Sequence, residues 1–174
     1  MLLSEKNKQR QKFIVVAGFS LSMINNVKII HTDSSDRDFQ KLSSQLEEEL
    51  FIRDGDLADI NFELNKIDFL PHVVLLTVEN KAAACGGFTQ YDSESIELKR
   101  MFVVPLHRRN KLASFVLSEL ERLAKQNNYT YCLLETGKNQ PEAIAFYRKH
   151  GYELVKNFGK YEDSLNSVCF KKQL

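Results

Sequence analysis

A pattern of largely apolar runs broken by short polar turns marks the centre of the chain. It runs through Val73–Glu79, Ala82–Tyr91 and Ile96–Val104, and only short polar turns separate these segments. Runs of this length between turn residues are typical of β-strands, so the three segments predict an antiparallel meander. Val27–His31 predicts an earlier short strand, and the continuous apolar centre of Thr130–Glu135 predicts a buried one.

Apolar residues recur every three to four positions in other segments, which predicts helices. One helix follows the capping residues Ser34–Asp36 and carries its apolar residues between Phe39 and Leu50. A second covers Ala113–Gln126, and a third begins near Pro141, because proline is favoured in the first helical turn.

Strands near Tyr152–Asn157 and Ser167–Lys171 complete the chain, and Asp54–Leu70 fits either a helix or an ordered loop. The order is therefore strand, helices, three-strand meander, helix, strand, helix and two strands. A strand–helix–strand step in the middle predicts a right-handed parallel crossover within a mixed sheet. We expect an α+β fold, an α/β sandwich in which helices flank one mixed sheet.

Composition narrows the class of protein and of partner. The 174 residues fit one domain, and 43% hydrophobic with 27% charged residues are typical of a soluble globular protein. A net charge of +1 gives no overall field that would attract nucleic acid or an anionic membrane, so we expect neither partner. Three widely separated cysteines predict buried, reduced thiols and a cytoplasmic location. The histidines lack metal-ligand spacing, so no metal is expected.

Residues 1–22 differ from the rest of the chain. Basic residues precede the apolar run Phe13–Leu21, which resembles the start of a signal peptide, although no small-residue cleavage site follows. A signal or membrane anchor, and an extra helix or strand packed on the domain, are the alternatives. We favour a dispensable extension at 1–22, followed by a single domain at 23–174.

The stretch His107–Ser114 (HRRNKLAS) lies between a predicted strand and a predicted helix and contains no glycine. The first turn of a helix presents free backbone N–H groups and the positive end of the helix dipole, which suits an anion. Arg108, Arg109 and Lys111 could add charge pairing with a phosphate. Taken by itself, the stretch fits either a phosphate-binding turn or a solvated basic loop.

Several motifs follow one another between Val27 and the end of the chain. They are ELKRM, the V-x-P strand end at Val103–Pro105 followed by Arg108 and a helix, ETGKNQPEAI and PEAIAFYRKHGY. In this order they resemble the GNAT (Gcn5-related) N-acetyltransferase superfamily, and within it a bacterial subgroup of general GNAT proteins. The resemblance implies the GNAT fold, with a central sheet of about six to seven strands. It also implies acetyl transfer from acetyl-CoA to a primary amine of a small molecule, by direct attack in a ternary complex and without a metal.

The resemblance further implies where acetyl-CoA binds. Its pantetheine arm would extend the sheet at Met101–Val103, and its pyrophosphate would rest on backbone N–H groups of Arg108 to Ala113. The cofactor-binding residues implied are Met101, Phe102, Val103, Arg108, Arg109, Asn110, Lys111, Leu112, Ala113, Ser114, Asn139, Gln140, Ala143 and Tyr147.

The turn departs from the family motif because Lys111 occupies a glycine position, and the missing glycine at Arg109 is a milder change. A β-carbon at Lys111 could crowd the pyrophosphate or point away from it. We expect it to point away, with its ammonium curling back to the phosphate, because helical dihedral angles at a first turn need no glycine.

Acetyl transfer requires that the amine lose a proton and that the leaving thiolate be stabilised or protonated. The resemblance implies that Tyr147 is the general acid near the sulfur. It implies that Glu97 acts as base, directly or through water; an exposed strand glutamate and a substrate-positioning carboxylate are the alternatives. Orientation of the amine and the thioester would supply much of the catalysis.

The acceptor site is predicted to comprise Asp54–Leu70, a meander turn and Phe158–Ser167. Acidic residues in the first of these favour a cationic amine, whereas Lys99 and Arg100 favour a substrate with a carboxylate, and the sequence does not decide. A non-catalytic acyl-CoA-binding or regulatory module is the alternative function, supported by the glycine-free turn and opposed by Tyr147. A homodimer through the C-terminal strands is also compatible with the sequence.

Overall fold

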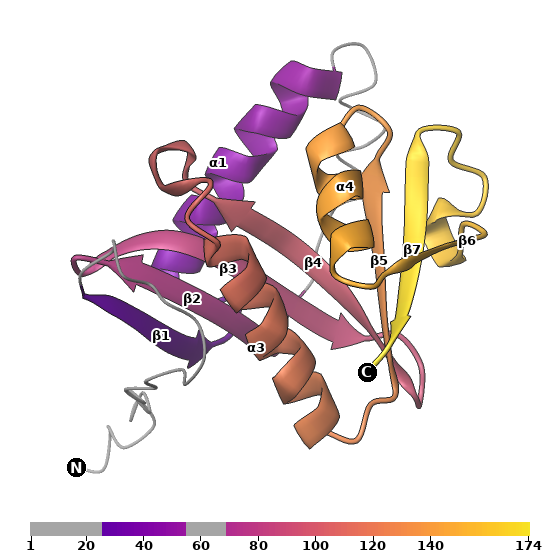
Figure 1. Ribbon diagram of the computed structural model, residues 1–174, viewed down its shortest axis with the longest axis horizontal. Coiled ribbons are helices and arrows are strands. Elements are labelled where there is room, and N and C mark those ends of the chain that lie inside the picture. The colour runs from indigo at the N-terminus through magenta and orange to yellow at the C-terminus, as the bar shows by residue number, and fades with distance from the viewer. Residues whose placement is uncertain (1–25, 55–68) are drawn as a thin grey trace, which may run out of the picture.

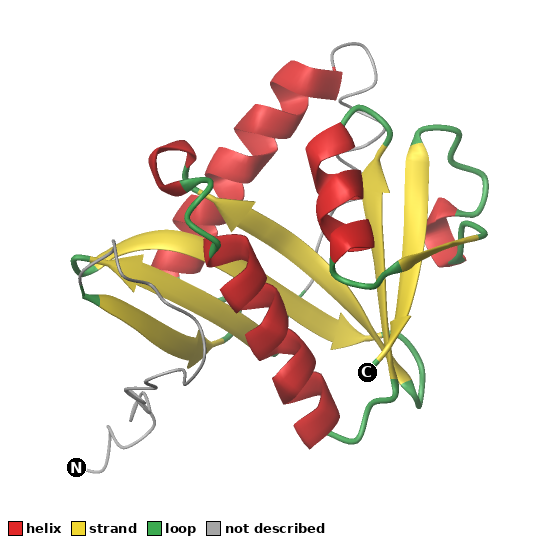
Figure 2. Ribbon diagram, in the orientation of Figure 1, coloured by secondary structure: helices red, strands yellow, loops and turns green. Residues whose placement is uncertain are grey.

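The computed structural model describes residues 26–54 and 69–174, which form one mixed sheet with helices on both faces (Figure 1). The strands are β1 (Val27–Thr32), β2 (His72–Val78), β3 (Lys81–Gln90), β4 (Ser95–Val103), β5 (Tyr131–Gly137), β6 (Glu153–Val155) and β7 (Ser167–Gln173), in the spatial order β1-β2-β3-β4-β5-β7-β6. The helices are α1 (Arg37–Asp54), α3 (Leu112–Gln126) and α4 (Pro141–Lys149), and 3-10 turns lie at Pro105–His107 and Gly159–Tyr161 (Figure 2).

The predicted α+β fold with one mixed sheet is confirmed, including the antiparallel meander of β2, β3 and β4 and the parallel pairing of β4 with β5. The expected extension at 1–22 lies outside the described residues, as does most of Asp54–Leu70, so neither prediction is tested.

Two hydrophobic cores join the layers, one on each face of the sheet. α1 covers one face, and α3 and α4 cover the other (Figure 1). The core under α1 includes Phe39, Leu42, Val73, Leu75 and Phe102. The core under α3 and α4 includes Ile96, Leu98, Leu117, Leu120, Tyr147 and Phe170. A helix on each face buries both sides of the central strands, which explains their nearly continuous apolar sequences.

The caps of the helices follow from local sequence. Asp36 Oδ1 accepts hydrogen bonds from the backbone nitrogens of Asp38 at 2.9 Å and Phe39 at 3.2 Å, which satisfies free donors in the first turn of α1. α4 begins at Pro141 as predicted. The chain leaves α4 through Gly151, whose φ of 82° is a left-handed conformation that glycine adopts without steric cost.

The cysteines are buried in the strands, as predicted. Cys85, Cys132 and Cys169 are free thiols, and burial raises the pKa of Cys85 and of Cys132 to about 12. Among residues 26–54 and 69–174, no group of three or more His, Cys, Asp or Glu side chains could hold a metal ion. No helix within the described part of the chain is long and apolar enough to cross a membrane.

β4 and β5 run side by side over only part of their length. They pair in parallel from Ser95–Leu98 on β4 and from Tyr131–Leu134 on β5, and then they diverge (Figure 1). Beyond this point, among the described strands, β4 pairs only with β3 and β5 pairs only with β7. The facing edges of the two strands therefore leave backbone N–H and C=O groups open to a ligand between them.

A β-bulge lies in β4 just where this separation begins. β3 pairs Cys85 with Phe102 but Gly87 with Lys99, so two steps along β3 correspond to three along β4. Arg100, within the bulge, has a φ of 59°. An extra residue reverses which face later side chains occupy. Glu97 and Lys99 lie before the bulge and already face the α1 side by strand alternation. The bulge keeps Arg100 on that side, where it pairs with Glu47, and returns Met101 to the α3 side.

Candidate active site

Two cavities meet where β4 and β5 separate. The larger has a volume of about 430 Å³ and lies between α1, the turn before α3, and α4. The smaller, of about 100 Å³, lies against β4, β5 and the loop after β6. Met101, Gln140, Ala143 and Tyr147 line both cavities. A ligand in one cavity therefore comes within reach of a group held in the other.

The larger cavity collects most of the predicted cofactor-binding residues. Those that line it are Met101, Phe102, Val103, Arg108, Arg109, Lys111, Leu112, Ala113, Ser114, Gln140, Ala143 and Tyr147. Asn110 and Asn139 are exposed and do not line it; the Asn110 side chain instead donates to the His107 carbonyl oxygen at 3.3 Å. The volume of the larger cavity falls within the roughly 300–1,000 Å³ typical of small-molecule sites. Cofactor binding by these residues stays a prediction.

The turn before α3 adopts left-handed backbone conformations without glycine. Arg109 has a φ of 65°, and Lys111, the N-cap residue of α3, has a φ of 61° and a ψ of 10°. The expectation of helical dihedral angles at Lys111 is therefore wrong, because the helix begins one residue later, at Leu112. A left-handed residue that carries a β-carbon costs roughly 1–2 kcal/mol. The missing glycines leave conformational strain in the turn.

Lys111→Gly is expected to raise the free energy of unfolding by about 1 kcal/mol, because glycine adopts this φ without a steric penalty. The same change should weaken acetyl-CoA binding several-fold and reduce its salt dependence, because one cation is lost from the cavity wall. Denaturant unfolding and calorimetric titration at two salt concentrations measure the two effects separately. Lys156→Gly, at an exposed lysine with an ordinary φ, is the matched control. Tighter binding by Lys111→Gly would instead identify the β-carbon as an obstacle to the phosphate.

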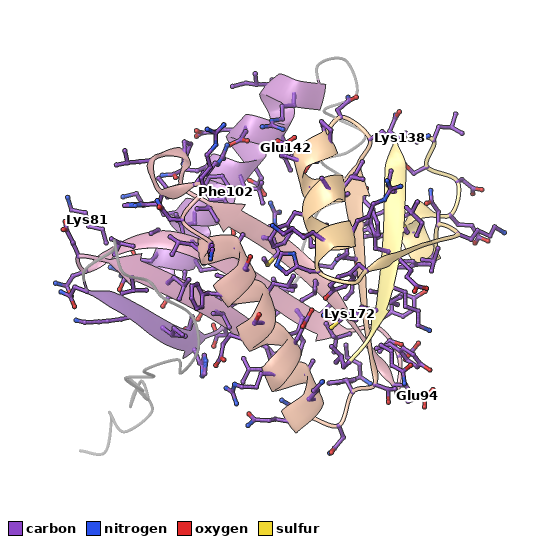
Figure 3. The ribbon with its side chains drawn as sticks, viewed as in Figure 1. Lys81, Glu94, Phe102, Lys138, Glu142 and Lys172 are labelled. Carbon is purple, nitrogen blue, oxygen red and sulfur yellow. The ribbon has the colours of Figure 1, made fainter. Side chains whose placement is uncertain are left out.

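Ion pairs connect α1 to the larger cavity. Arg108 pairs with Glu49 of α1, and its Nε donates to the carbonyl oxygen of Val103 at 3.0 Å. Arg53 pairs with Glu49 at 2.9 Å and with Glu142, which lies in the first turn of α4 beside the end of α1 (Figure 3). The Arg108 guanidinium is thus held at the cavity wall, where a phosphate group would compete with Glu49 for it.

His150 orients the Ser114 hydroxyl at the same wall. Its Nδ1 lies 2.8 Å from the carbonyl oxygen of Phe146, which can only accept, so this nitrogen carries the proton of the neutral ring. Its Nε2 lies 2.9 Å from Ser114 Oγ and therefore accepts the hydroxyl hydrogen. In this tautomer Ser114 has oxygen lone pairs left to offer to the cavity.

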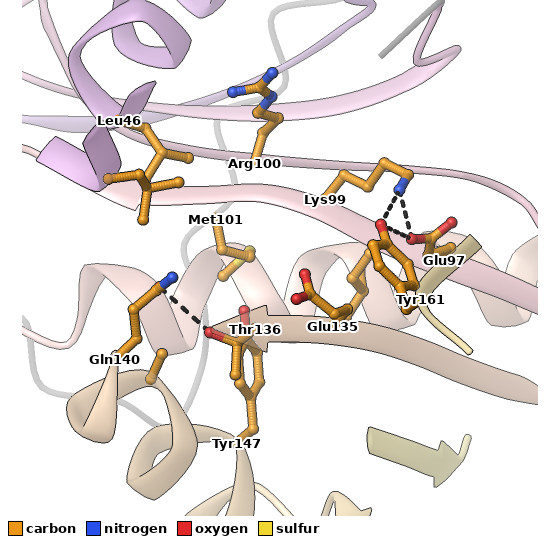
Figure 4. A pocket seen from close by; sticks show the side chains of 13 residues that line it. Leu46, Glu97, Lys99, Arg100, Met101, Glu135, Thr136, Gln140, Tyr147 and Tyr161 are labelled. Carbon is orange, nitrogen blue, oxygen red and sulfur yellow. Dashed lines mark hydrogen bonds and ion pairs between the residues drawn. The ribbon is translucent and has the colours of Figure 1, made fainter. Parts of the chain in front are cut away.

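Tyr147 lies at the junction of the two cavities, on α4 (Figure 4). It is only 7% exposed, and its ring packs edge-on against Phe146 at 5.3 Å and Tyr152 at 5.7 Å between centroids. Burial, and to a smaller extent the charge of Glu135, raises the pKa of Tyr147 well above its ordinary value. The hydroxyl therefore stays protonated near neutral pH and is suited to donate a hydrogen.

Glu97 is buried on β4, at 8% exposure, so it is not an exposed strand glutamate. It forms an ion pair with Lys99, and its Oε1 accepts a hydrogen bond from the Tyr161 hydroxyl at 2.8 Å (Figure 4). Lys99 Nζ also donates to Tyr161 Oη at 3.1 Å. Tyr161 comes from the Phe158–Ser167 loop that was predicted to contribute to the acceptor site. The carboxylate of Glu97 is thus held by two neighbours.

Sequence reasoning missed Glu135, a second carboxylate in the smaller cavity. It lies on β5, next to the strand that carries Glu97 (Figure 4). Burial raises the pKa of Glu135 above its ordinary value. A hydrogen bond from Ser167 and the charge of Lys99 oppose this rise, and the charge of Glu97 adds to it. A lone charged residue at the end of an otherwise apolar, buried strand was the signal that could have revealed it.

A family model and a curated relative match this chain. The model of the Acetyltransferase (GNAT) family matches residues 35–152. The chain is 33% identical over 107 residues to an IAA acetyltransferase of Azospirillum brasilense, an alignment that covers 60% of this chain and 70% of that protein. The family model spans the meander, the turn before α3 and the strand β5 within or beside the candidate site.

Solved structures share the architecture. A Klebsiella pneumoniae protein assigned as an acyl-CoA N-acyltransferase superposes with a TM-score of 0.69 at 27% identity, covering 84% of this chain and 97% of that one. A GNAT family acetyltransferase from Elizabethkingia anophelis, solved with acetyl-CoA bound, has a TM-score of 0.61 at 16% identity, covering 86% and 99%. At 16% identity, the similarity to the Elizabethkingia protein shows a shared fold alone. From the family model, the relative and the fold together, the chain belongs to the GNAT acetyltransferase family.

Proposed function

We propose that this protein is an N-acetyltransferase that transfers an acetyl group from acetyl-CoA to a primary amine of a small molecule, by direct attack within a ternary complex. The observation that carries this proposal is the separation of β4 from β5 beside Tyr147. An extended pantetheine arm would occupy the opening and pair with Met101 and Val103 as an added strand does. The Elizabethkingia relative, which was solved with acetyl-CoA, supports this choice of ligand.

The larger cavity offers the charge that a pyrophosphate needs. Arg108, Arg109 and Lys111 line it, next to the first turn of α3. The backbone N–H groups of that turn have no helical partners, so they can donate to phosphate oxygens. Phosphate binding would release Arg108 from its pair with Glu49. The cofactor would then run from this turn, past Met101, to the hydroxyl of Tyr147.

In the chemical step we assign the general base to Glu135 and the general acid to Tyr147. The acceptor ammonium gives one proton to Glu135, and the resulting amine forms a C–N bond with the thioester carbonyl. The C–S bond breaks as the sulfur takes the Tyr147 hydroxyl proton, and the remaining extra proton on nitrogen passes to the Tyr147 phenolate. A raised pKa makes a carboxylate a stronger base, and burial raises the pKa of Glu135. Glu97, held by Lys99 and Tyr161, is better suited to position the acceptor than to take its proton.

Binding and turnover must both be measured to test the proposal. Calorimetric titration with acetyl-CoA is expected to show binding at one site, and a thiol reagent is expected to show CoA release that depends on an added amine. A panel of alkylamines, amino acids and aromatic amines covers the acceptor classes. Without amine, the rate of CoA release should fall to that of slow thioester hydrolysis.

A non-catalytic acyl-CoA-binding or regulatory module is the second candidate. The strained, glycine-free turn at Arg109 and Lys111 favours it, because catalysis demands accurate placement of the thioester. Acetyl-CoA binding without thiol release for any amine, together with unchanged properties of Tyr147→Phe, would support the module and overturn the enzyme.

A further inference from the structure

The smaller cavity already contains a cation supplied by the protein itself. Lys99 is 12% exposed at its side chain, and its ammonium pairs with Glu97 and lies 3.1 Å from the Tyr161 hydroxyl oxygen. All three side chains line the cavity next to Glu135 (Figure 4). An amine that enters to react must therefore share this space with the Lys99 ammonium.

Most charged side chains around the smaller cavity form ion pairs, so their charges nearly cancel. Lys99 neutralises Glu97, and Arg100 lies 2.6 Å from Glu47 of α1. Among the residues that the structure describes, Glu135 is left as the carboxylate without an ion-pair partner inside the cavity, and its half-buried position makes that charge costly. The exposed Lys160 acts on Glu135 more weakly than Lys99 does. One positive charge on the acceptor would complete the balance.

We propose that Lys99 is a built-in cation that determines acceptor specificity, restricting the enzyme to amines with one positive charge and no neighbouring carboxylate. The inference rests on the proposed function. Lys99 would repel a second positive charge on the acceptor, because the nearby carboxylate of Glu97 is already paired with Lys99 and is not available to the acceptor. Glu135 and Glu97 would repel a carboxylate on the acceptor, because Lys99 is already paired with Glu97 and cannot neutralise it. Of the alternatives that the sequence left open, a cationic acceptor and one with a carboxylate, this proposal adopts the cation.

Lys99→Met tests this inference, because methionine fills a similar volume without the charge. Loss of Lys99 leaves Glu97 and Glu135 as two unmatched carboxylates, which suits a diamine. The measured quantity is kcat/KM for ethylenediamine, putrescine and cadaverine, each divided by kcat/KM for the monoamine of the same chain length. Wild-type enzyme should prefer the monoamine. Lys99→Met should shift the ratio towards the best-fitting diamine by at least about tenfold.

Two further variants separate a charge effect from damage to the cavity. Glu97→Gln combined with Lys99→Met removes both charges and leaves Glu135 alone, so the ratio should return to that of wild type. Glu97→Gln by itself leaves Lys99 unmatched, so kcat/KM for γ-aminobutyrate relative to butylamine should rise. This second ratio still tests the inference if Lys99→Met does not fold. Lys156→Met, at an exposed lysine outside both cavities, should change neither ratio.

The outcomes distinguish this inference from the function on which it rests. Wild-type protein that releases no thiol with any amine would overturn the proposed function and the inference with it. Amine-dependent thiol release with ratios that do not change in Lys99→Met or in Glu97→Gln would leave the function standing and overturn the role of Lys99. Complete loss of turnover in Glu97→Gln and in the double variant, with Lys99→Met still active, would also overturn it, because Glu97 would then be the base.

Discussion

Glu135→Gln is expected to lower kcat by about 10²- to 10⁴-fold, because glutamine keeps the shape of glutamate but cannot take the proton of the attacking amine. The KM for acetyl-CoA should change little, since Glu135 lines the smaller cavity and not the larger one that contains the basic turn. Steady-state kinetics of thiol release, with each substrate varied in turn, measures both constants.

The pH profile of the same enzyme gives a second readout. A base works only when it is unprotonated, so kcat/KM falls as the pH drops below the pKa of Glu135. Burial raises that pKa, so the fall should occur at higher pH than for an ordinary carboxyl group. Ser167→Ala removes the hydrogen bond that lowers the pKa of Glu135, so the decrease in kcat/KM should occur at still higher pH. Glu135→Gln should abolish it.

A control defines what would contradict the assignment. Glu153→Gln changes an exposed glutamate on β6 and should leave the kinetics unaltered. Retained activity in Glu135→Gln, with activity lost in Glu97→Gln, would transfer the role of base to Glu97.

Tyr147→Phe is expected to lower kcat by about 10²-fold, because phenylalanine keeps the ring packing but has no hydroxyl to protonate the leaving sulfur. Since the lost interaction is made in the transition state, kcat and kcat/KM should fall together while calorimetric affinity for acetyl-CoA is retained. Tyr91→Phe, at a residue that is 42% exposed, is the matched control. A variant that loses cofactor affinity at unchanged kcat would show that Tyr147 binds the cofactor and is not an acid.

Most of the secondary structure was predictable because it depends on neighbours in the sequence. The apolar runs in Val73–Glu79 and the other meander segments correspond to β2, β3 and β4, and the apolar stripe of Ala113–Gln126 corresponds to α3. The caps at Asp36 and Pro141 lie where the side chains themselves set the helix start. The walls of the larger cavity were also predictable, because one continuous motif supplies most of them.

Other features depend on residues far apart in the chain. β7 inserts between β5 and β6, an order that periodicity does not encode. The bulge at Arg100 had a weak signal, two adjacent charged residues within an alternating strand, but its position depends on the pairing with β3. Glu135 was passed over because it ends an apolar run in the sequence, whereas its functional neighbours come from β4 and from the loop after β6.

The sequence by itself determined the order and type of the elements, the helix starts and the basic turn, because each follows from contacts within a few residues. Only the tertiary structure decided that Lys111 is left-handed and that Glu97 is held by Lys99 and by Tyr161, 64 positions away. It also decided that Glu135 has no ion-pair partner in its cavity among the described residues. The physical reason is that the charge state and the pairing of a buried group depend on what packs around it, and packing joins segments that are distant in sequence.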